Sequence, residues 1–385
     1  MRTTINIVRG LFSIIVAWCL PCDMVRGEGV PSQSPSSFEG KRAILDGDIP
    51  SWTKKEHVDE VLSRIKRAGF NVYMPTVWQG RGTAWPSKHA PWDTKLEDRP
   101  KSNFDPLRYA IEKAHEMGIE VHPWFTLTLR QSNIFPEFAL SSMPQKAFDV
   151  HNPEFRELLV KLIEEVTVGY DIDGINLDYV RAIELCTSMK CEDEYSRTYK
   201  RSLNGDTMLF RMIPNRIPSL IDYQETAVTT LVRGISEAVR AKKPNLLLSA
   251  DVFVGHAPLN QGQNSVSWVN DGLIDVIFRM DYGRQLNIAA MDRTRQELNY
   301  PDKQNLLISN MSNPAEMASG QAYFARDGKW LADTITDIQK RWPKTGIAVY
   351  FYKYLTDEQI AALQNVWPRI KQPIPIKQPI PRAMH

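Results

Sequence analysis

Cysteine is scarce in this sequence, with four among 385 residues, and two of them, Cys19 and Cys22, lie in the apolar N-terminal segment. The remaining pair, Cys186 and Cys191, has no histidine nearby, so the usual four ligands of a zinc site are missing. In an oxidising compartment, two cysteines this close form a disulfide. We therefore expect a Cys186–Cys191 disulfide and no metal, with two free thiols as the alternative.

An excess of charge of either sign is also missing. The chain has 47 Lys and Arg against 45 Asp and Glu. Such a balance gives no electrostatic case for nucleic acid or an anionic membrane as a partner. Beyond the N-terminus there is no long apolar run, and the N-terminal run at 11–20 is too short to span a bilayer.

The first 27 residues have the pattern of an export signal. Arg2 and Arg9 make the first residues basic, and an apolar run follows them. Val25 and Gly27 are small enough for cleavage after Gly27. Cleavage would remove three arginines and one aspartate, which leaves no formal net charge. We expect a protein that is secreted or held in the periplasm or cell envelope, and an uncleaved anchor is the alternative.

Several motifs that bind cofactors or activate nucleophiles are absent. The sequence has no P-loop, no HExxH pair, no GxSxG nucleophile elbow and no Gly-rich phosphate loop after its first strand-like run. These absences argue against nucleotide-dependent enzymes, zinc proteases and α/β-hydrolases. We expect neither a cofactor nor a metal.

The sequence does contain a regular alternation of apolar and amphipathic runs. Eight apolar, strand-like runs lie at 43–46, 70–77, 119–125, 172–178, 246–252, 274–280, 305–309 and 346–351. Each is followed by an amphipathic, helix-like run, at 54–68, 105–117, 153–168, 220–241, 264–271, 285–298, 329–340 and 356–365. Strict alternation implies a parallel sheet.

Eight such units fit a closed (β/α)8 TIM barrel in a single domain over 42–366. A doubly wound open sheet is the alternative, although it would want the missing phosphate loop. Residues 28–41 read as a linker and 367–385 as a Pro-rich tail, and we expect 28–40 and 371–385 to add little to the core. Two long segments, 79–104 and 179–219, follow strand ends and should build the active face.

Aspartates stand at the ends of three neighbouring predicted strands. In the run 172–178 the side chains alternate, so Ile175 and Leu177 should face the helices, while Asn176 and Asp178 should face the barrel axis. An inward aspartate at a strand end points to function, with a cap or an ion pair as the alternative.

Asp251 lies near the end of the next strand-like run, and Asp281 directly follows the one after it. Alternate residues from Val276 to Met280 are apolar, so we expect Asp281 to share the inward face with Arg279. Glycoside hydrolysis commonly needs two carboxylates, one to protonate the leaving oxygen and one to attack carbon or activate water. Crowded like charges raise one pKa and so supply a proton donor. The assignment of roles stays open, and loop capping or hydroxyl binding is the alternative for Asp251 and Asp281.

Other side chains near the same strand ends are suited to binding sugar. Four aromatic residues could stack on sugar rings, and we expect His122 to contact a sugar or a carboxylate. The predicted substrate-binding set is Trp78, His122, Trp124, Asn176, Tyr179, Arg181 and Tyr282.

Four stretches resemble the glycosyl-hydrolase-like family ten, and a fifth, GIAVYFY, fits as well. The four are FDPLRYAIEKAHEMGIEVHPWF, HNPEFRELLVKLIEEVTVGYDIDGINLDYVR, LLLSADVF and GLIDVIFRMDYG. The resemblance covers roughly 42–366 and implies a barrel glycosidase of the bacterial envelope that acts on peptidoglycan-type or other glycans. Two positions depart from related patterns: Tyr179 stands where the family often has a second acid, and Val180 stands where a chitinase has glutamate.

These observations predict a secreted glycoside hydrolase with carboxylate acid/base chemistry and an oligo- or polysaccharide substrate. The competing hypothesis is a glycan-binding barrel without catalysis. The sequence carries no signal for an oligomeric state, and no membrane contact is expected beyond the export signal.

Overall fold

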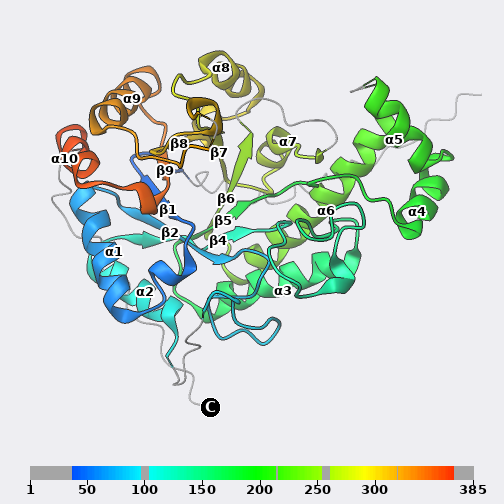
Figure 1. Cartoon of the computed structure of the whole chain (residues 1–385), viewed down its shortest axis with the longest axis horizontal. Helices are drawn as coiled ribbons and strands as arrows, with labels where there is room; N and C mark the ends of the chain where they lie inside the picture. Colours follow the sequence, from blue (N-terminus) through cyan, green and yellow to red (C-terminus); the bar gives the residue numbers. More distant parts are fainter. Residues whose placement is uncertain (1–36, 97–103, 214–215, 254–260, 319, 368–385) are drawn as a thin grey trace, which may run out of the picture. The chain divides into compact units, whose positions relative to one another are not determined.

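The computed structural model describes residues 37–96, 104–213, 216–253, 261–318 and 320–367, and in this part of the chain parallel strands close into a barrel (Figure 1). The hydrogen-bonded order is β1-β9-β8-β7-β6-β5-β4-β2, and β2 pairs with β1 to close the ring. The strands are β1 (Arg42–Asp46), β2 (Val72–Trp78), β3 (Glu120–Val121), β4 (Trp124–Thr126), β5 (Gly174–Asp178), β6 (Leu247–Phe253), β7 (Val276–Asp281), β8 (Gln304–Ser309) and β9 (Ile347–Tyr350).

The predicted (β/α)8 barrel is therefore confirmed, with one local difference. The third predicted strand is divided in two, because β3 and β4 are separated by His122 and Pro123. Both halves pair with β2, so together they fill one place in the barrel.

Helices surround the barrel and cover its outer face (Figure 1). Their amphipathic sequences bury one side against the strands. Asp105 and Asn152 cap their helices, since each side chain accepts a backbone N–H of the first turn. The helices are α1 (Lys55–Ala68), α2 (Pro106–Glu116), α3 (Pro153–Gly169), α4 (Met189–Tyr199), α5 (Leu203–Met212), α6 (Pro218–Lys242), α7 (Ser265–Asn270), α8 (Ile288–Glu297), α9 (Gly328–Arg341) and α10 (Asp357–Val366).

The segment expected to be a linker contributes to the core inside the barrel, which corrects that expectation. Phe38 is fully buried and packs edge-on against Phe278 at 4.8 Å between ring centroids. A side chain at Gly346 would meet the Phe38 ring at 2.3 Å, so the glycine leaves the space that the ring fills. Phe38 joins the apolar cluster Ala43, Leu45, Val72, Met74, Trp124, Leu247, Val276, Phe278, Leu307 and Ala348.

The boundary of the predicted C-terminal tail is also one residue too early. Trp367 is buried and packs on Phe70, and the Arg42 guanidinium lies over its ring. The rest of the tail, like the predicted export signal, lies outside the described residues.

The long segment after β5 folds into helices α4 and α5, which Figure 1 shows at a distance from the strands. Cys186 and Cys191 form the predicted disulfide at its beginning. Both cysteines lie in a separate small core with Tyr195, Phe210 and Tyr223. Among the described residues, no helix is long and apolar enough to cross a membrane.

Candidate active site

Strand β5 places its polar side chains as the alternation in its sequence predicts. Ile175 and Leu177 join the apolar layer between barrel and helices. Asn176 and Asp178 point the other way, toward β6 and the barrel mouth. The strand ends at Asp178, which therefore stands at the rim of the barrel.

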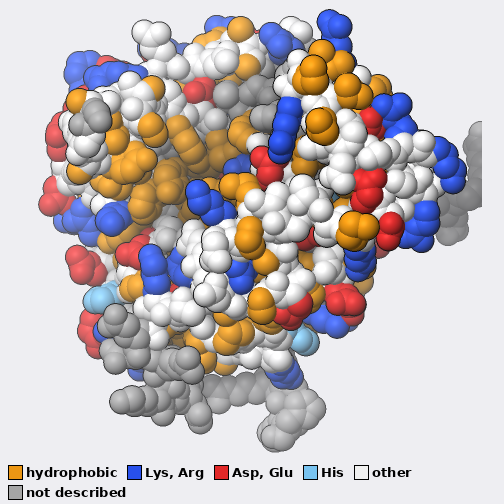
Figure 2. All heavy atoms as spheres, turned by 45° about the vertical axis from the view of Figure 1, so that its right-hand side comes forward, with side chains coloured by type: hydrophobic (Ala, Val, Ile, Leu, Met, Phe, Trp, Pro, Cys, Tyr) orange, Lys and Arg blue, Asp and Glu red, His pale blue; other side chains and the backbone are white. Residues whose placement is uncertain are grey.

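A cavity of about 350 Å³ opens above the carboxyl ends of the strands, and Asp178 lines it. Its volume lies in the range of small-molecule sites. In Figure 2, hydrophobic side chains, with which tyrosine is coloured, gather around a hollow in one face of the molecule. The residues that line the cavity are Gln79, Trp124, Thr126, Leu129, Gln131, Asp178, Tyr179, Arg181, Phe253, Met280, Tyr282 and Tyr350.

Asp251 is the buried neighbour of Asp178. In the pairing of β5 with β6, Asn176 lies opposite Ser249 and Leu177 opposite Ala250, so the next residues, Asp178 and Asp251, lie at one level on adjacent strands. The Asn176 amide donates to Asp251 Oδ1 at 3.1 Å, and Oδ2 has no hydrogen-bond partner within the described structure. Asp251 is 1% exposed and Asp178 6%, so Asp178 is the member of the pair that meets the cavity.

The two carboxyl groups hold protons more tightly than free aspartates. Burial raises the pKa of Asp251 well above its ordinary value, and the negative charge of Asp178 raises it further. Burial also raises the pKa of Asp178, while the charge of Arg181 and the N–H of Tyr179 lower it. Because neighbouring like charges oppose each other's ionisation, the charge of Asp178 adds to the effect of burial on the pKa of Asp251.

The turn after Asp178 is fixed in an unusual backbone conformation. Tyr179 has φ of 48°, in the left-handed region that bulky residues rarely adopt, and its N–H donates to Asp178 Oδ1 at 2.6 Å. The Thr128 hydroxyl contacts the carbonyl oxygens of Tyr179 and Arg181 at 2.8 and 2.7 Å. The Arg181 guanidinium lies over the rings of Tyr179 and Phe253, so it forms part of the cavity wall.

Three aromatic rings also line the cavity. Tyr282 and Tyr350 stack with ring centroids 5.5 Å apart, and Trp124 meets Tyr350 edge-on at 6.2 Å. Such faces suit sugar rings, which present C–H groups to aromatic surfaces. The cavity therefore combines a carboxyl group with aromatic walls and a guanidinium.

Asp281 does not reach this cavity, which corrects the prediction. Met280 points into the barrel mouth, so Asp281 and Arg279 point outward, and Arg279 donates to Thr294 on α8. Asp281 instead accepts the backbone N–H of Asn287 at 2.6 Å and caps the loop after β7. The prediction failed because the apolar side chains of β7 fill the barrel interior instead of facing the helices.

Trp78 and His122 also lie away from the cavity lining. The register between β2 and β4 shifts between Thr76 and Trp78, and Trp78 is buried against Phe148 on the outer side. His122 points inward but lies deep in the barrel, where its ring occupies the space over Gly174. Of its two predicted contacts, the structure shows the carboxylate, with His122 Nε2 and Glu120 Oε2 3.2 Å apart.

Of the predicted residues, the structure brings Trp124, Asp178, Tyr179, Arg181 and Tyr282 together on the cavity lining. Asn176 is buried behind it and holds Asp251. Sequence reasoning missed Tyr350, which ends β9 and lines the cavity.

Gln131 was also missed, and its position depends on a buried ion pair. Arg81 pairs with Asp93 at 2.9 Å and donates to the Gln131 side chain. Gly80 and Gly82 allow this close packing, because a side chain at either one would meet neighbouring backbone atoms at 1.9 and 2.4 Å. No local sequence pattern announces such a contact between distant loops.

A cluster of possible metal ligands lies elsewhere in the described structure, where Asp149, Cys186 and Cys191 approach within 4.8 Å. Both sulfurs are committed to the disulfide, so they cannot act as thiolate ligands. We assign no metal to this cluster.

The closed parallel barrel, together with a match to a family model, places the protein among the glycoside hydrolase-like (β/α)8 barrels. The chain belongs to the family described as Glycosyl hydrolase-like 10, whose model matches residues 44–305. It is 23% identical over 236 residues to glycosyl hydrolase YngK of Bacillus subtilis. The alignment covers 55% of this chain and 43% of YngK. It is also 23% identical over 256 residues to glycosyl hydrolase DigH of Escherichia coli. That alignment covers 56% of this chain and 55% of DigH. The chain thus spans about half the length of these curated relatives.

Solved structures agree on the fold. The glycoside hydrolase domain of PgaB (BpsB) from Bordetella bronchiseptica superposes with a TM-score of 0.58 at 10% identity, over 85% of this chain and 98% of that one. Alpha-L-fucosidase isoenzyme 2 from Paenibacillus thiaminolyticus superposes with a TM-score of 0.58 at 13% identity. The superposition covers 85% of this chain and 48% of the fucosidase chain. At these identities the likeness concerns the barrel alone.

Proposed function

We propose that this protein hydrolyses glycosidic bonds in an oligo- or polysaccharide, with Asp178 as the carboxyl group that acts on the bond. The observation that carries the proposal is the position of Asp178, which lines an aromatic cavity while its partner Asp251 lies buried behind it. The family and its glycosidase-like relatives support the same reaction class.

In this mechanism the carboxyl pair holds one proton, and with the substrate bound that proton is on Asp178, the member of the pair that lines the cavity. Asp178 donates the proton to the glycosidic oxygen as the bond from that oxygen to the anomeric carbon breaks. Water adds its hydroxide to the anomeric carbon, and the proton that the water loses returns to the pair. Asp251 acts through Asp178, because its own carboxyl group does not line the cavity.

The direct test is turnover of a panel of oligosaccharides, including N-acetylglucosamine oligomers and glycan strands of peptidoglycan. We expect new reducing ends to accumulate with at least one substrate, and product masses should identify the bond that is cleaved. Saccharide binding without release of reducing ends on the whole panel would contradict hydrolysis.

That outcome would favour the second candidate, a barrel that binds glycans without cleaving them. Its supporting observation is that Asp178 is the one carboxylate among the described residues that line the cavity. Tyr179 occupies the next position, where the resemblance would place a second acid.

We further propose that the protein works outside the cytoplasm, in the cell envelope or as a secreted enzyme. The basic and apolar pattern of residues 1–27 supports this location. The Cys186–Cys191 disulfide fits an oxidising compartment.

Replacing Asp251 by Asn should move the pH dependence of hydrolysis in a defined direction. In the native pair, removing the last proton puts two negative charges side by side, which raises the pKa of that step. Without Asp251 this repulsion is gone, so Asp178 should lose its proton at lower pH. The alkaline limb of kcat/KM should therefore shift to lower pH, and the rate at neutral pH should fall by about tenfold or more.

The control is Asp281→Asn, which removes an aspartate at the end of a nearby strand that points away from the cavity. Its alkaline limb should stay where the native one lies. The account of the pair is wrong if Asp251→Asn leaves the limb in place, or if both variants move it equally.

A further inference from the structure

A second cavity, of about 360 Å³, lies beside the first at the ends of β8 and β9. It shares Tyr282 and Tyr350 with the first cavity, so the two meet at this stacked pair of rings. The residues that line it are Tyr282, Ser309, Met311, Ser312, Asn313, Pro314, Tyr323, Tyr350, Phe351, Lys353 and Tyr354.

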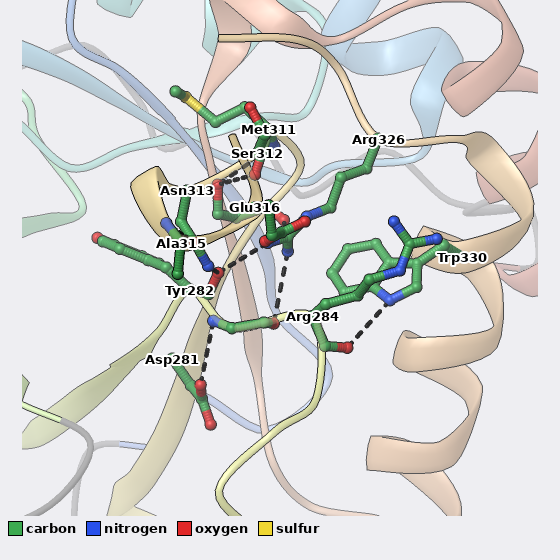
Figure 3. A network of polar contacts seen from close by, with 12 residues as sticks. Asp281, Tyr282, Arg284, Met311, Ser312, Asn313, Ala315, Glu316, Arg326 and Trp330 are labelled. Atoms are coloured by element: carbon green, nitrogen blue, oxygen red, sulfur yellow. Dashed lines mark hydrogen bonds and ion pairs between the residues drawn. The ribbon is translucent and has the colours of Figure 1, made fainter. Parts of the chain in front are cut away.

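A network of polar contacts around Arg326, drawn in Figure 3, includes lining residues of this cavity such as Tyr282, Ser312 and Asn313. The guanidinium of Arg326 donates to the carbonyl oxygens of Tyr282 and Ser309 at 2.8 and 2.9 Å, which ties the loops after β7 and β8 together. Arg326 also pairs with Glu316, and its guanidinium lies 4.3 Å from the ring centre of Trp330. A wall fixed in this way is ready for a ligand before the ligand arrives.

The loop after β8 is fastened at two further points. The amide of Asn313 donates to the carbonyl oxygen of Tyr282 at 2.8 Å (Figure 3). Ser312 and Phe324 exchange hydrogen bonds: the Ser312 N–H donates to the Phe324 carbonyl, and the Phe324 N–H donates to the Ser312 hydroxyl. The position of Tyr282, which belongs to both cavities, therefore depends on the loop that forms the second one.

The chemistry of the lining suits a sugar that is bound and not cleaved. Tyr323, Phe351 and Tyr354 offer ring faces for stacking, and Lys353 offers an ammonium group for sugar hydroxyls. The described lining of the second cavity contains no carboxylate, so it lacks the acid/base group of the first.

We propose that the second cavity is a sugar subsite, which holds a neighbouring sugar of the glycan chain whose scissile bond lies at Asp178. This inference rests on the proposed function, because it takes the first cavity as the place of cleavage. It identifies the substrate class as a glycan chain that spans both cavities, as opposed to a single terminal sugar on an unrelated group.

The test measures binding on an array that presents common sugars as mono-, di- and longer saccharides. Asp178→Asn protein is used so that cleavage cannot remove the ligand. We expect the affinity to rise with chain length, and the double variant Tyr323→Ala, Lys353→Ala to bind the longer chains about tenfold more weakly, which corresponds to about 1.4 kcal/mol. Neither side chain lines the first cavity, and Tyr323 is 46% exposed, so the fold should tolerate the change.

The matched control is Tyr300→Ala, which removes another exposed tyrosine that lines neither cavity. It should keep the full rise of affinity with chain length. The subsite is refuted if the double variant binds long chains as tightly as the control does.

Binding that depends on length, without hydrolysis by the native protein, would keep the subsite and reject the proposed function. Hydrolysis that is insensitive to chain length would keep the function and reject the subsite, and an absence of any saccharide binding would reject both.

Discussion

Replacing Asp178 by Asn should lower kcat/KM by at least about a thousandfold, which corresponds to roughly 4 kcal/mol of transition-state stabilisation. The variant keeps the shape of the side chain but cannot donate the proton that the glycosidic oxygen needs. In the structure Asp178 lines the aromatic cavity, and its Oδ1 accepts the Tyr179 N–H, a bond that the Asn side chain can still accept. The fold and the ground-state binding of sugar should therefore survive.

Steady-state kinetics on the best substrate of the panel checks this expectation. The melting temperature and the dissociation constant for the same saccharide serve as controls, and both should stay close to the native values. A loss of activity that came with a lower melting temperature or weaker binding would indicate damage to the site instead. Near-native kcat/KM in a folded Asp178→Asn protein would remove Asp178 from the mechanism.

Replacing Phe38 by Ala should lower the free energy of unfolding by about 3–5 kcal/mol, the usual loss for a fully buried phenylalanine. The Phe38 ring packs on Phe278 inside the barrel and fills the space left by Gly346. Its removal leaves a cavity that the surrounding strands cannot close without moving. Urea denaturation followed by tryptophan fluorescence would measure the loss.

Phe324→Ala is the matched control, because Phe324 is 37% exposed. Its removal should cost well under half as much free energy as the removal of Phe38. Equal and small effects for the two variants would show that the segment before β1 does not stabilise the barrel.

The sequence predicted the barrel because each strand and helix carries its own periodic signal. The inward position of Asp178 followed from the alternation of Ile175 and Leu177 with Asn176 along one strand. That reasoning succeeded because the upper part of β5 presents polar groups to the barrel mouth.

The same reasoning failed for Asp281, because the inside of a barrel is itself apolar in its lower layers. Val276 and Phe278 pack with Phe38 inside the barrel, so the apolar face of β7 is the inner one. Which face of an alternating strand is inward depends on the residues that fill the centre, and those come from the whole chain. Trp78 failed for another reason, since a register shift between β2 and β4 leaves no mark in the local sequence.

Contacts between distant loops were likewise beyond prediction from local patterns. Arg81 and Asp93 pair within the loop after β2, and this pair positions Gln131, which belongs to the loop after β4. The Arg326 contacts that shape the second cavity tie the ends of β7 and β8 to a loop ahead of α9. Each of these arginines reads as an ordinary surface charge in the sequence.

The most direct test of the central claim is the crystal structure of Asp178→Asn protein with an oligosaccharide bound. We predict that the scissile glycosidic oxygen lies within hydrogen-bond distance of the residue 178 side chain. One flanking sugar should lie against the stacked rings of Tyr282 and Tyr350, with the chain continuing into the second cavity. A saccharide bound with every glycosidic oxygen out of reach of residue 178 would contradict the account.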